Sequence, residues 1–361
     1  MSIDTIATPA LLLDLDTLER NLDRMAARAD ALGVRLRPHI KTHKCPAIGE
    51  LQQRRGAAGI TVSTLYEAQV FAEHGFNDIT WAFPVILSRI EDALALAARV
   101  RLGLVIDSSE ALEALRIGAD SGAPVRIWLK VDCGYHRAGV DPAAEQLLAL
   151  AGAIDAAANL DFAGILSHSG HAYYAYGAAA RRAVADAERD VMVAAAERLR
   201  AAGIEVPDVS VGSTPAMTAV QSLEGISEAR PGNYAFYDYT QCALGSCEPR
   251  DSAVSVLTSV VSRMPHHSVV DAGALTMSKD PGPSQQSAGM GPVLLDDGEI
   301  DPGLRLQSVS QEHGIINRPL PVGSRLRIMP NHSCLTAACF DEYTVVRQGK
   351  VVDHWKIWRS R

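Results

Sequence analysis

The feature that most constrains this chain is a regular alternation of strand-like and helix-like segments that begins at residue 35. Each unit opens with a short run of β-branched and apolar residues. This run ends in polar residues or glycine, and a stretch rich in Ala, Leu, Glu and Arg follows it. Eight strands are expected, at Arg35–Lys41, Gly59–Thr64, Asp78–Pro84, Leu102–Asp107, Val125–Asp132, Phe162–His168, Val209–Ser213 and Ser227–Pro231.

Helices are expected between these strands, for example at Pro46–Arg55, Ser109–Asp120 and Ala178–Ala202. Eight strand–helix units favour a parallel (β/α)₈ barrel of α/β class over an open doubly wound sheet. No G-x-G-x-x-G sequence follows the first strand, which argues against a dinucleotide-binding fold.

After about residue 245 the pattern changes to short strands separated by turn signals, which predicts a second, antiparallel β domain. Its strands are expected at Ser255–Arg263, Ser268–Asp271, Leu304–Ser310, Arg325–Met329 and Tyr343–Arg347. An opening strand at Leu11–Asp14 precedes the barrel and is expected to pair with this domain. The predicted division is therefore a barrel at residues 17–245 and a discontinuous β domain at residues 1–16 and 246–361.

Charge and hydropathy exclude several classes of protein. The chain has 34 Lys and Arg against 42 Asp and Glu, a net charge of −8, and no basic block, so nucleic acid is not an expected partner. The N-terminus lacks the pattern of a secretory signal, and charge interrupts every apolar run before about 18 residues, so no membrane segment is expected. We expect a cytoplasmic enzyme, in which the six cysteines need not form disulfides.

Polar residues follow several of the expected strands. In a parallel barrel the site forms at the C-terminal ends of the strands, and phosphate is usually held by the loops after strands seven and eight. Those loops read Gly212-Ser213-Thr214-Pro215 and Pro231-Gly232-Asn233. A Gly-Ser-Thr-Pro sequence alone can simply cap a helix, but the two loops together predict a phosphate site.

Lys41, at the end of the first strand, is expected to point towards this phosphate site. Partial desolvation there would lower the pKa of an amine and prepare it for imine formation. Pyridoxal 5′-phosphate is the phosphate-bearing cofactor that needs one lysine, so a Schiff base on Lys41 is expected. Lys44 is the competing lysine, but the Cys-Pro sequence after it suggests that it faces a helix start. His39 and His43 are either packed side chains or cofactor contacts.

The sequence resembles the fold type III pyridoxal phosphate enzymes, and within them the D-serine dehydratase and D-threonine aldolase group, over nearly the whole chain. The lysine segment and the final His-x-Cys are the specific matches. The matching segments are Thr8-Pro9-Ala10-Leu11-Leu12-Leu13-Asp14, Arg37-Pro38-His39-Ile40-Lys41-Thr42-His43-Lys44, Val131-Asp132-Cys133-Gly134 with Arg137 and Gly139-Val140, Gly212-Ser213-Thr214-Pro215, Pro231-Gly232-Asn233-Tyr234 and Pro330-Asn331-His332-Ser333-Cys334.

The resemblance implies roles for individual residues. It makes Lys41 the Schiff-base lysine and implies a homodimer with part of each active site at the subunit boundary. Asp271-Ala272-Gly273 either approaches a neighbour's cofactor or forms an ordinary turn. By the same resemblance the phosphate is held by Ser213, Thr214, Gly232 and Asn233, and the pyridine ring or its substituents are contacted by Arg137 and Tyr173.

His332 and Cys334 predict a metal site. Residues two apart on a strand face the same side, so one ion could meet both side chains, and two protein ligands leave positions open for water and substrate. Imidazole with thiolate favours zinc. The resemblance sharpens this prediction, because dehydratase-like members carry His-x-Cys here, whereas the aldolases typically carry His-x-Asp.

We therefore expect a metal-dependent D-serine dehydratase, which eliminates the hydroxyl of a D-3-hydroxy amino acid to give a 2-oxo acid and ammonia. A D-threonine-type aldolase and a D-threo-3-hydroxyaspartate dehydratase stay open as alternatives. A protein that binds pyridoxal phosphate without turnover is disfavoured, because such proteins resemble the barrel alone. A racemase needs a second acid or base, for which Tyr343 is the late candidate.

Overall fold

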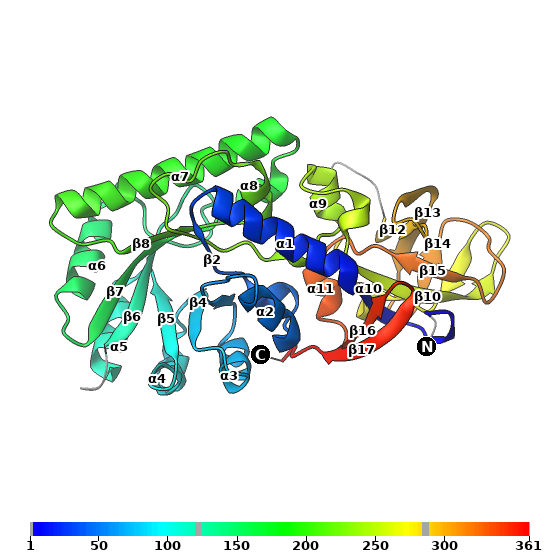
Figure 1. The fold of residues 1–361 in the computed structure, drawn as a ribbon, viewed down its shortest axis with the longest axis horizontal. Helices are drawn as coiled ribbons and strands as arrows, with labels where there is room; N and C mark the ends of the chain where they lie inside the picture. Colours follow the sequence, from blue (N-terminus) through cyan, green and yellow to red (C-terminus); the bar gives the residue numbers. More distant parts are fainter. Residues whose placement is uncertain (1–2, 120–123, 284–288, 361) are drawn as a thin grey trace. The chain divides into compact units, whose positions relative to one another are not determined.

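All eight strands expected in the barrel are present in the computed structural model, which describes residues 3–119, 124–283 and 289–360 (Figure 1). Their bounds are β2 Arg35–Leu36, β3 Ile60–Val62, β4 Asp78–Pro84, β5 Arg101–Ile106, β6 Val125–Lys130, β7 Leu160–Leu166, β8 Asp208–Val211 and β9 Glu228–Ala229. The strands pair in parallel in the order β2-β9-β8-β7-β6-β5-β4-β3. The sheet curls. Among the described residues its edges are joined by one bridge, between His39 and Thr61, and by a backbone hydrogen bond from Ala58 to Leu36, so the closed barrel we expected has a seam between β2 and β3.

The chain divides into two units, which we call the barrel unit and the β unit. The barrel unit contains residues 26–41 and 52–232 together with the last two residues of the chain. The β unit contains residues 1–25, 42–51 and 233–359. The domain boundaries expected from the sequence stay predictions.

Helices lie on the outside of the curled sheet of the barrel unit (Figure 1). Several begin at a residue whose side chain accepts a hydrogen bond from the first turn: Thr64 forms a capping box with Glu67, and Ser108 accepts from Ala111. The helices are α3 Leu65–Glu73, α4 Ile90–Ala97, α5 Ser109–Gly118, α6 Glu145–Asp155, α7 Ala178–Ala201 and α8 Thr214–Ala219, with the short turns η2 Ile40–Thr42, η3 Leu87–Arg89 and η4 Gly170–Tyr174.

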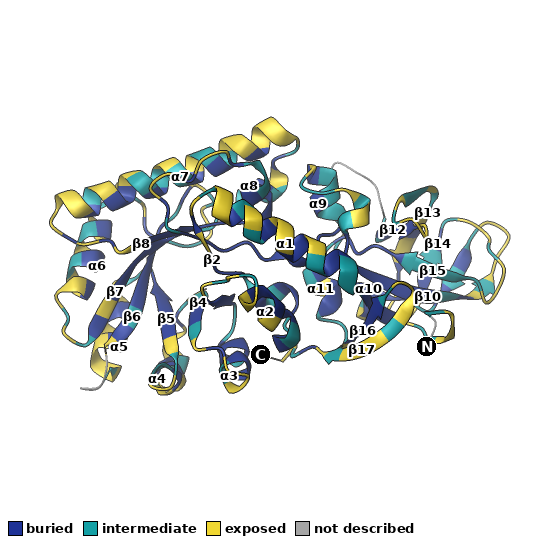
Figure 2. Ribbon diagram, viewed as in Figure 1, coloured by how far each residue is buried: buried dark blue, intermediate teal, exposed yellow. Residues whose placement is uncertain are grey.

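Two further helices link the units in sequence, α1 Leu15–Ala31 and α2 Pro46–Gln53. The helices expected at Pro46–Arg55 and Ala178–Ala202 are present as α2 and α7, to within two residues at each end. The helix expected at Ser109–Asp120 is present as α5, and its expected last residue, Asp120, lies outside the described residues. Figure 2 shows the consequence of the amphipathic pattern, with buried strands and with exposed residues on the outer faces of the helices.

The first barrel strand is shorter than expected, because β2 ends at Leu36 rather than at Lys41. Pro38 has no N–H to donate to a ladder, which interrupts the regular strand. The backbone nevertheless continues along β9, since the N–H of His39 donates to the carbonyl of Pro231 at 2.9 Å. Lys41 therefore lies on the turn η2, beyond the strand.

The interior of the barrel contains a buried ionic network in place of a purely apolar core. Arg37 donates through Nε to Glu228 at 2.6 Å and through Nη1 to Asp78 at 2.6 Å. Burial disfavours the charge on Arg37, but Glu228 and Asp78 outweigh it and hold the pKa of the guanidinium above its usual value. The other oxygen of Glu228 accepts a hydrogen bond from Ser210 at 2.7 Å.

The β unit is built on a nine-stranded sheet in the order β11-β14-β13-β12-β15-β10-β1-β16-β17. The strand β10 also pairs with β11, so six of these strands close into a small antiparallel barrel. The bounds are β1 Ala10–Asp14, β10 Val254–Arg263, β11 Ser268–Val270, β12 Gly291–Leu294, β13 Ile300–Val309, β14 Gly314–Ile316, β15 Arg325–Ile328, β16 Glu342–Arg347 and β17 Lys350–Lys356.

The five late strands expected from the sequence are present as β10, β11, β13, β15 and β16. The opening strand β1 pairs with β10 and β16, as predicted. The short helical elements of this unit are η1 Ile3–Thr5, η5 Asn233–Ala235, α9 Tyr239–Leu244, η6 Pro249–Asp251, α10 Ala274–Met277 and α11 Ser333–Ala337. Throughout the described part of the chain, no helix has the length and apolar character needed to span a bilayer.

Candidate active site

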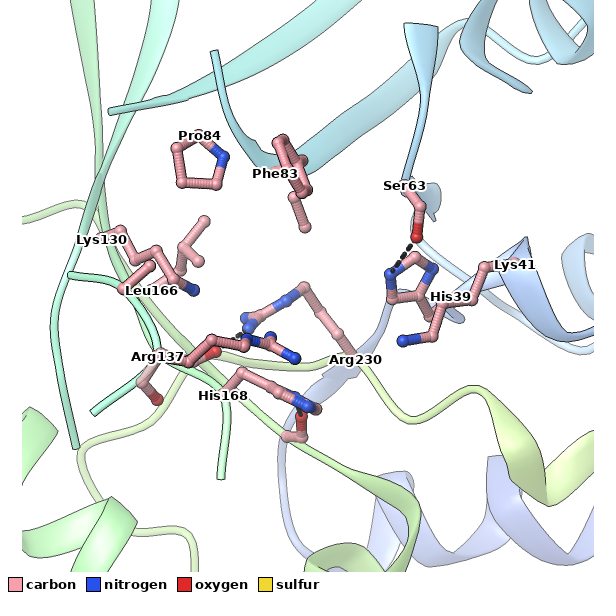
Figure 3. Close-up of a pocket in the computed structure, with 14 residues that line it drawn as sticks. His39, Lys41, Ser63, Phe83, Pro84, Lys130, Arg137, Leu166, His168 and Arg230 are labelled. Carbon is pink, nitrogen blue, oxygen red and sulfur yellow. Dashed lines mark hydrogen bonds between the residues drawn. The ribbon is translucent and has the colours of Figure 1, made fainter. Parts of the chain in front are cut away.

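A cavity of about 320 Å³ lies in the barrel unit at the C-terminal ends of the strands. Lys130 is the last residue of β6, His168 follows β7 by two residues, and Arg230 follows β9 directly. Lys41 enters from η2 (Figure 3). Because the strands are parallel, their carboxyl ends gather these side chains at one edge, where barrel enzymes build their sites.

The lining of this cavity is strongly basic. Six of its residues are basic, and none is Asp or Glu. These residues are His39, Lys41, Lys130, Arg137, His168 and Arg230. A cavity of this composition fits a small ligand with several negative charges, such as a phosphate ester together with a carboxylate.

Lys130 is the most deeply enclosed amine of this group, with 4% of its surface exposed. Burial, followed by the charges of Arg230 and Arg137, lowers the pKa of Lys130 to about 8. Among the described residues, the Lys130 side chain has no hydrogen-bond or ion-pair partner. An anion that enters the cavity can therefore pair with Lys130 without displacing a protein carboxylate.

His168 is held as a neutral ring. Burial, followed by the charge of Lys41, lowers the pKa of His168 well below its usual value. Its Nδ1 lies 2.9 Å from the carbonyl oxygen of Gly212, and a carbonyl can only accept, so Nδ1 carries the proton. The other ring nitrogen, Nε2, is then the acceptor.

Arg230 is buried at the inner end of the cavity. Its guanidinium donates to the hydroxyl of Ser210 and to the carbonyl oxygen of Ser167. Ser210 in turn donates to Glu228, so Arg230 is connected to the ionic network of the barrel interior. Burial lowers the pKa of Arg230, while the nearby carboxylate of Glu228 opposes that effect.

A buried carboxylate, Glu188 of α7, ties together the loops beside the cavity. It is 2% exposed and accepts hydrogen bonds from Ser167 at 2.7 Å and Ser169 at 2.5 Å. The N–H of Gly212 also donates to it, at 3.3 Å. Glu188 therefore fixes the chain on both sides of His168 and at the start of the loop that contains Ser213.

Of the residues predicted to bind the cofactor, Lys41, His39 and Arg137 line the cavity (Figure 3). Tyr173 is half-buried on η4 and is not among the lining residues. Ser213, Thr214 and Gly232 are buried close to the strand ends and do not line the cavity. Asn233 begins η5 in the β unit and does not line the cavity either. Ser213 caps α8, accepting from the N–H of Ala216 at 3.3 Å.

The competing residues of the lysine segment lie elsewhere. Lys44 has a backbone φ of 48° and belongs to the β unit, where its carbonyl accepts from the N–H of Trp358 at 2.8 Å. His43 is fully buried, with its ring against Phe236. Neither residue lines the cavity.

His332 and Cys334 follow β15, as expected, but they lie at the start of α11 in the β unit, so the strand geometry by which we expected them to face the same side was wrong. His332 is the N-cap residue of the helix, and Cys334 is in its first turn. The helix start nevertheless turns the two side chains towards each other, within hydrogen-bond reach. Nδ1 of His332 lies 3.1 Å from Asp280, which leaves Nε2 as the ring atom able to bind an ion.

The surroundings of His332 favour positive charge. Burial lowers the pKa of His332, but Cys334 and Asp280 outweigh burial and raise that pKa to about 11. A position that holds a proton this strongly between sulfur and carboxylate also suits a cation. Among the described residues no cluster of three or more His, Cys, Asp or Glu has ligand geometry, so a metal here would have two protein ligands and open positions.

Tyr343 does not offer its hydroxyl as an acid or base. It is fully buried, and its OH donates to the carbonyl oxygen of His43 at 2.8 Å. Burial raises the pKa of this phenol well above its usual value. Asp271 likewise has internal partners, the hydroxyls of Thr8 and Thr258 at 2.6 Å each.

Sequence reasoning gave no site role to Lys130, His168, Arg230 or Glu188, although it placed His168 at the end of the sixth expected strand. The available signal for Lys130 was a charged residue at the end of an apolar strand. The signal for Arg230 was that it directly precedes the expected phosphate loop Pro231-Gly232. Glu188 has no comparable signal, because it lies among the many charged residues of a long helix.

Comparison with known proteins agrees with this arrangement. Residues 13–240 match the family model of the alanine racemase N-terminal domain, and residues 253–346 match a putative serine dehydratase domain. A D-threo-3-hydroxyaspartate dehydratase from Delftia sp. is 39% identical, with 98% of this chain and 97% of that protein covered. A D-serine dehydratase from Dictyostelium discoideum is 35% identical, again with 98% and 97% covered.

The solved structure of the Delftia sp. HT23 dehydratase superimposes with a TM-score of 0.96 at 38% identity, over 100% of both chains. A cysteine-to-alanine variant of a D-threo-3-hydroxyaspartate dehydratase, described as a metal-free form, superimposes with a TM-score of 0.95 at 38% identity, over 100% of both chains.

Proposed function

Because this chain belongs to the fold type III pyridoxal phosphate enzymes, in the D-serine dehydratase and D-threonine aldolase group, we propose that it dehydrates a D-3-hydroxy amino acid. The products are a 2-oxo acid and ammonia. The observation that carries this proposal is the cavity of the barrel unit, in which Lys41 stands among basic residues and no carboxylate. The size of the cavity, about 320 Å³, is at the lower end of the range usual for small-molecule sites.

The basic lining supports a cofactor that carries phosphate. When bound, pyridoxal phosphate supplies an electron-accepting ring that weakens the bonds at the substrate Cα. Lys41 would hold the cofactor through Nζ and, once the substrate amine had replaced it, Nζ would take the Cα proton. Arg137 and Arg230 would neutralise the negative charges of cofactor and substrate, since no acidic residue of the lining competes for them.

His168 would orient the ligand without adding charge, because its ring is neutral and offers Nε2 as an acceptor. For the remaining contacts we keep the roles that the resemblance implies. Arg137 and Tyr173 would contact the ring or its substituents. The phosphate would be held by Ser213, Thr214, Gly232 and Asn233.

We propose that His332 and Cys334 hold a zinc ion, because imidazole nitrogen and thiolate sulfur are ligands that zinc prefers. Bound zinc supplies a Lewis acid, which stabilises the negative charge that develops as a hydroxyl leaves. Asp280 would fix the tautomer and orientation of His332 through the 3.1 Å contact with Nδ1. We also propose a homodimer, as in two-domain relatives of this fold.

The product assay tests the reaction. D-Serine, D-threonine and D-threo-3-hydroxyaspartate are offered separately to the enzyme loaded with pyridoxal phosphate and zinc, with and without a chelator. We expect a 2-oxo acid and ammonia, and loss of that activity with the chelator. Glycine and an aldehyde or 2-oxo acid would instead identify an aldolase. Activity that is unchanged by complete removal of zinc would exclude the metal from the reaction.

One observation favours D-threo-3-hydroxyaspartate as the preferred substrate. This substrate has a second carboxylate, and the cavity contains the buried side chain of Lys130, which has no ion-pair partner among the described residues. A substrate carboxylate bound there would give the buried ammonium group of Lys130 an ion-pair partner. D-Serine has no second carboxylate, so with its single carboxylate bound elsewhere in the site it could not make this contact.

A further inference from the structure

Two cysteines that the proposed reaction does not use lie side by side at the end of α9. Cys242 is in the last turn of this helix, and Cys247 follows the helix end by three residues. Their sulfur atoms are 3.4 Å apart, close enough for one thiol to hydrogen-bond to the other, and both side chains are half-buried. The pair belongs entirely to the β unit.

The backbone sets this approach. Gly245 ends the helix in the left-handed conformation, with φ of 79°, and its N–H donates to the carbonyl of Cys242 at 2.9 Å. The N–H of Ser246 donates to the carbonyl of Gln241 at 2.8 Å. These two bonds reverse the chain and return Cys247 to the side of the helix. The sulfur pair is therefore fixed by a hydrogen-bonded turn.

The geometry is close to that of a disulfide. A sulfur–sulfur bond is about 2.05 Å long, so the two sulfurs need to approach by about 1.4 Å. The hydrogen bond to Cys242, followed by burial, raises the pKa of the Cys247 thiol, so Cys247 retains its proton in the reduced pair. Attack on an external disulfide then begins at Cys242, and Cys247 is the resolving thiol.

The same helix begins at a residue that contacts the predicted metal site. Asp238, the N-cap of α9, is 1% exposed and accepts hydrogen bonds from the N–H of Ser333 at 3.0 Å and from Asn233 at 2.7 Å. Ser333 stands between His332 and Cys334 in the sequence. The N–H of Cys242 donates to the carbonyl of Asp238 at 3.0 Å, so one helical turn joins the thiol pair to this residue.

We propose that Cys242 and Cys247 form a reversible disulfide, and that its formation weakens zinc binding by His332 and Cys334 through the displacement of Asp238. The metal part of this inference rests on the proposed function, whereas the disulfide part does not. The oxidant is a low-molecular-weight disulfide such as glutathione disulfide.

The reaction is a pair of exchanges. The thiolate of Cys242 attacks one sulfur of glutathione disulfide and releases one glutathione thiolate. Cys247 loses its proton to solvent, attacks the mixed disulfide at Cys242, and releases the second glutathione. Two protein thiols are oxidised, and one glutathione disulfide is reduced to two glutathione thiols.

Peptide mapping tests the disulfide directly. The full-length protein, loaded with zinc and pyridoxal phosphate, is equilibrated with glutathione disulfide, alkylated and digested with trypsin. Trypsin does not cut between Arg230 and Pro231, so both cysteines fall in one peptide, residues 201–250, which has no other cysteine. We expect this peptide to lose two hydrogen atoms and to resist alkylation until dithiothreitol is added. Free thiols at both positions, or glutathione retained on either, would overturn the proposal.

Zinc release to a chromogenic chelator tests the coupling. We expect oxidation to speed release by about tenfold in the wild type and in Cys339→Ser, and to have no effect in Cys247→Ser. Cys339 is the matched control, because it is also a half-buried thiol of the β unit. A mapped disulfide with unchanged zinc release would overturn the coupling. A protein that binds no zinc in either state would contradict the proposed metal site and with it the coupling, and would leave the mapped disulfide standing.

Discussion

Glu228 provides the most quantitative test of the barrel interior. Its side chain is 1% exposed and accepts one charge-assisted hydrogen bond from Nε of Arg37 at 2.6 Å, together with a bond from Ser210 at 2.7 Å. The substitution Glu228→Gln keeps the size of the side chain but leaves the buried Arg37 without the more deeply buried of its two carboxylate partners. Removing one partner of a buried ion pair typically costs about 3–5 kcal/mol.

We expect the low end of that range, about 3 kcal/mol, because Asp78 still accepts from Arg37 at 2.6 Å. This loss corresponds to a decrease of about 150-fold in the ratio of folded to unfolded protein. The matched control is Glu113→Gln, which breaks an exposed ion pair with Arg116. We expect no measurable change in stability for that variant, since exposed pairs contribute little.

Urea unfolding measures both variants. The fluorescence of Trp81 and Trp128 reports on the barrel unit, because each side chain is 1% exposed in the folded protein, whereas Trp355 and Trp358 are partly exposed. A loss of less than about 1 kcal/mol in Glu228→Gln, or an equal loss in Glu113→Gln, would refute the reasoning that burial makes the Arg37 pair important.

Three further predictions concern the site. Lys41→Ala should lose the visible absorption of the protein-bound cofactor, whereas Lys44→Ala should retain it; absorption spectra of the reconstituted proteins check this, and a coloured, active Lys41→Ala would contradict the assignment. Cys334→Ala should lose zinc and keep the cofactor, and Asp280→Asn should weaken zinc binding by about 10–100-fold, as metal analysis and competition with a chelator would show. Lys130→Met should raise the KM for D-threo-3-hydroxyaspartate by about 10–100-fold, because it removes the proposed charged hydrogen bond to the second carboxylate of this substrate, and should change the KM for D-serine much less. Equal changes in the two KM values would show that Lys130 does not recognise the second carboxylate.

The barrel strands could be predicted because each is a short β-branched or apolar run that ends in polar residues or glycine. The strands β12, β14 and β17 were missed for local reasons. Glycine and proline begin β12 at Gly291-Pro292, and β14 has only three residues. In β17, most side chains are exposed, so an alternating apolar pattern is weak. Each is placed by its pairing with another strand, β12 and β14 with β13, and β17 with β16.

The site was predictable where one residue type determines the chemistry. The position of Lys41 was predictable because imine formation requires an amine that points into the cofactor site, and Lys41 lines the cavity from the turn η2 just beyond β2. The local geometry of His332 and Cys334 was not predictable from spacing, since residues two apart can share a face on a strand or meet at a helix start. Glu188 depends on long-range burial, which no short motif encodes.

The seam of the parallel sheet determines where the barrel opens locally most easily. Between β2 and β3 the backbone is joined by few bonds, those from Ala58 to Leu36 at 2.9 Å and from Thr61 to Pro38 at 2.8 Å. Local opening costs least where a ladder is shortest, so amide hydrogens here should exchange with solvent sooner than those of the central strands. The turn η2, which contains Lys41, follows β2, so the part of the barrel that opens most easily lies next to the Lys41 amine. The aldehyde cofactor would then enter where β2 and β3 separate transiently, while the other strands of the sheet stay paired.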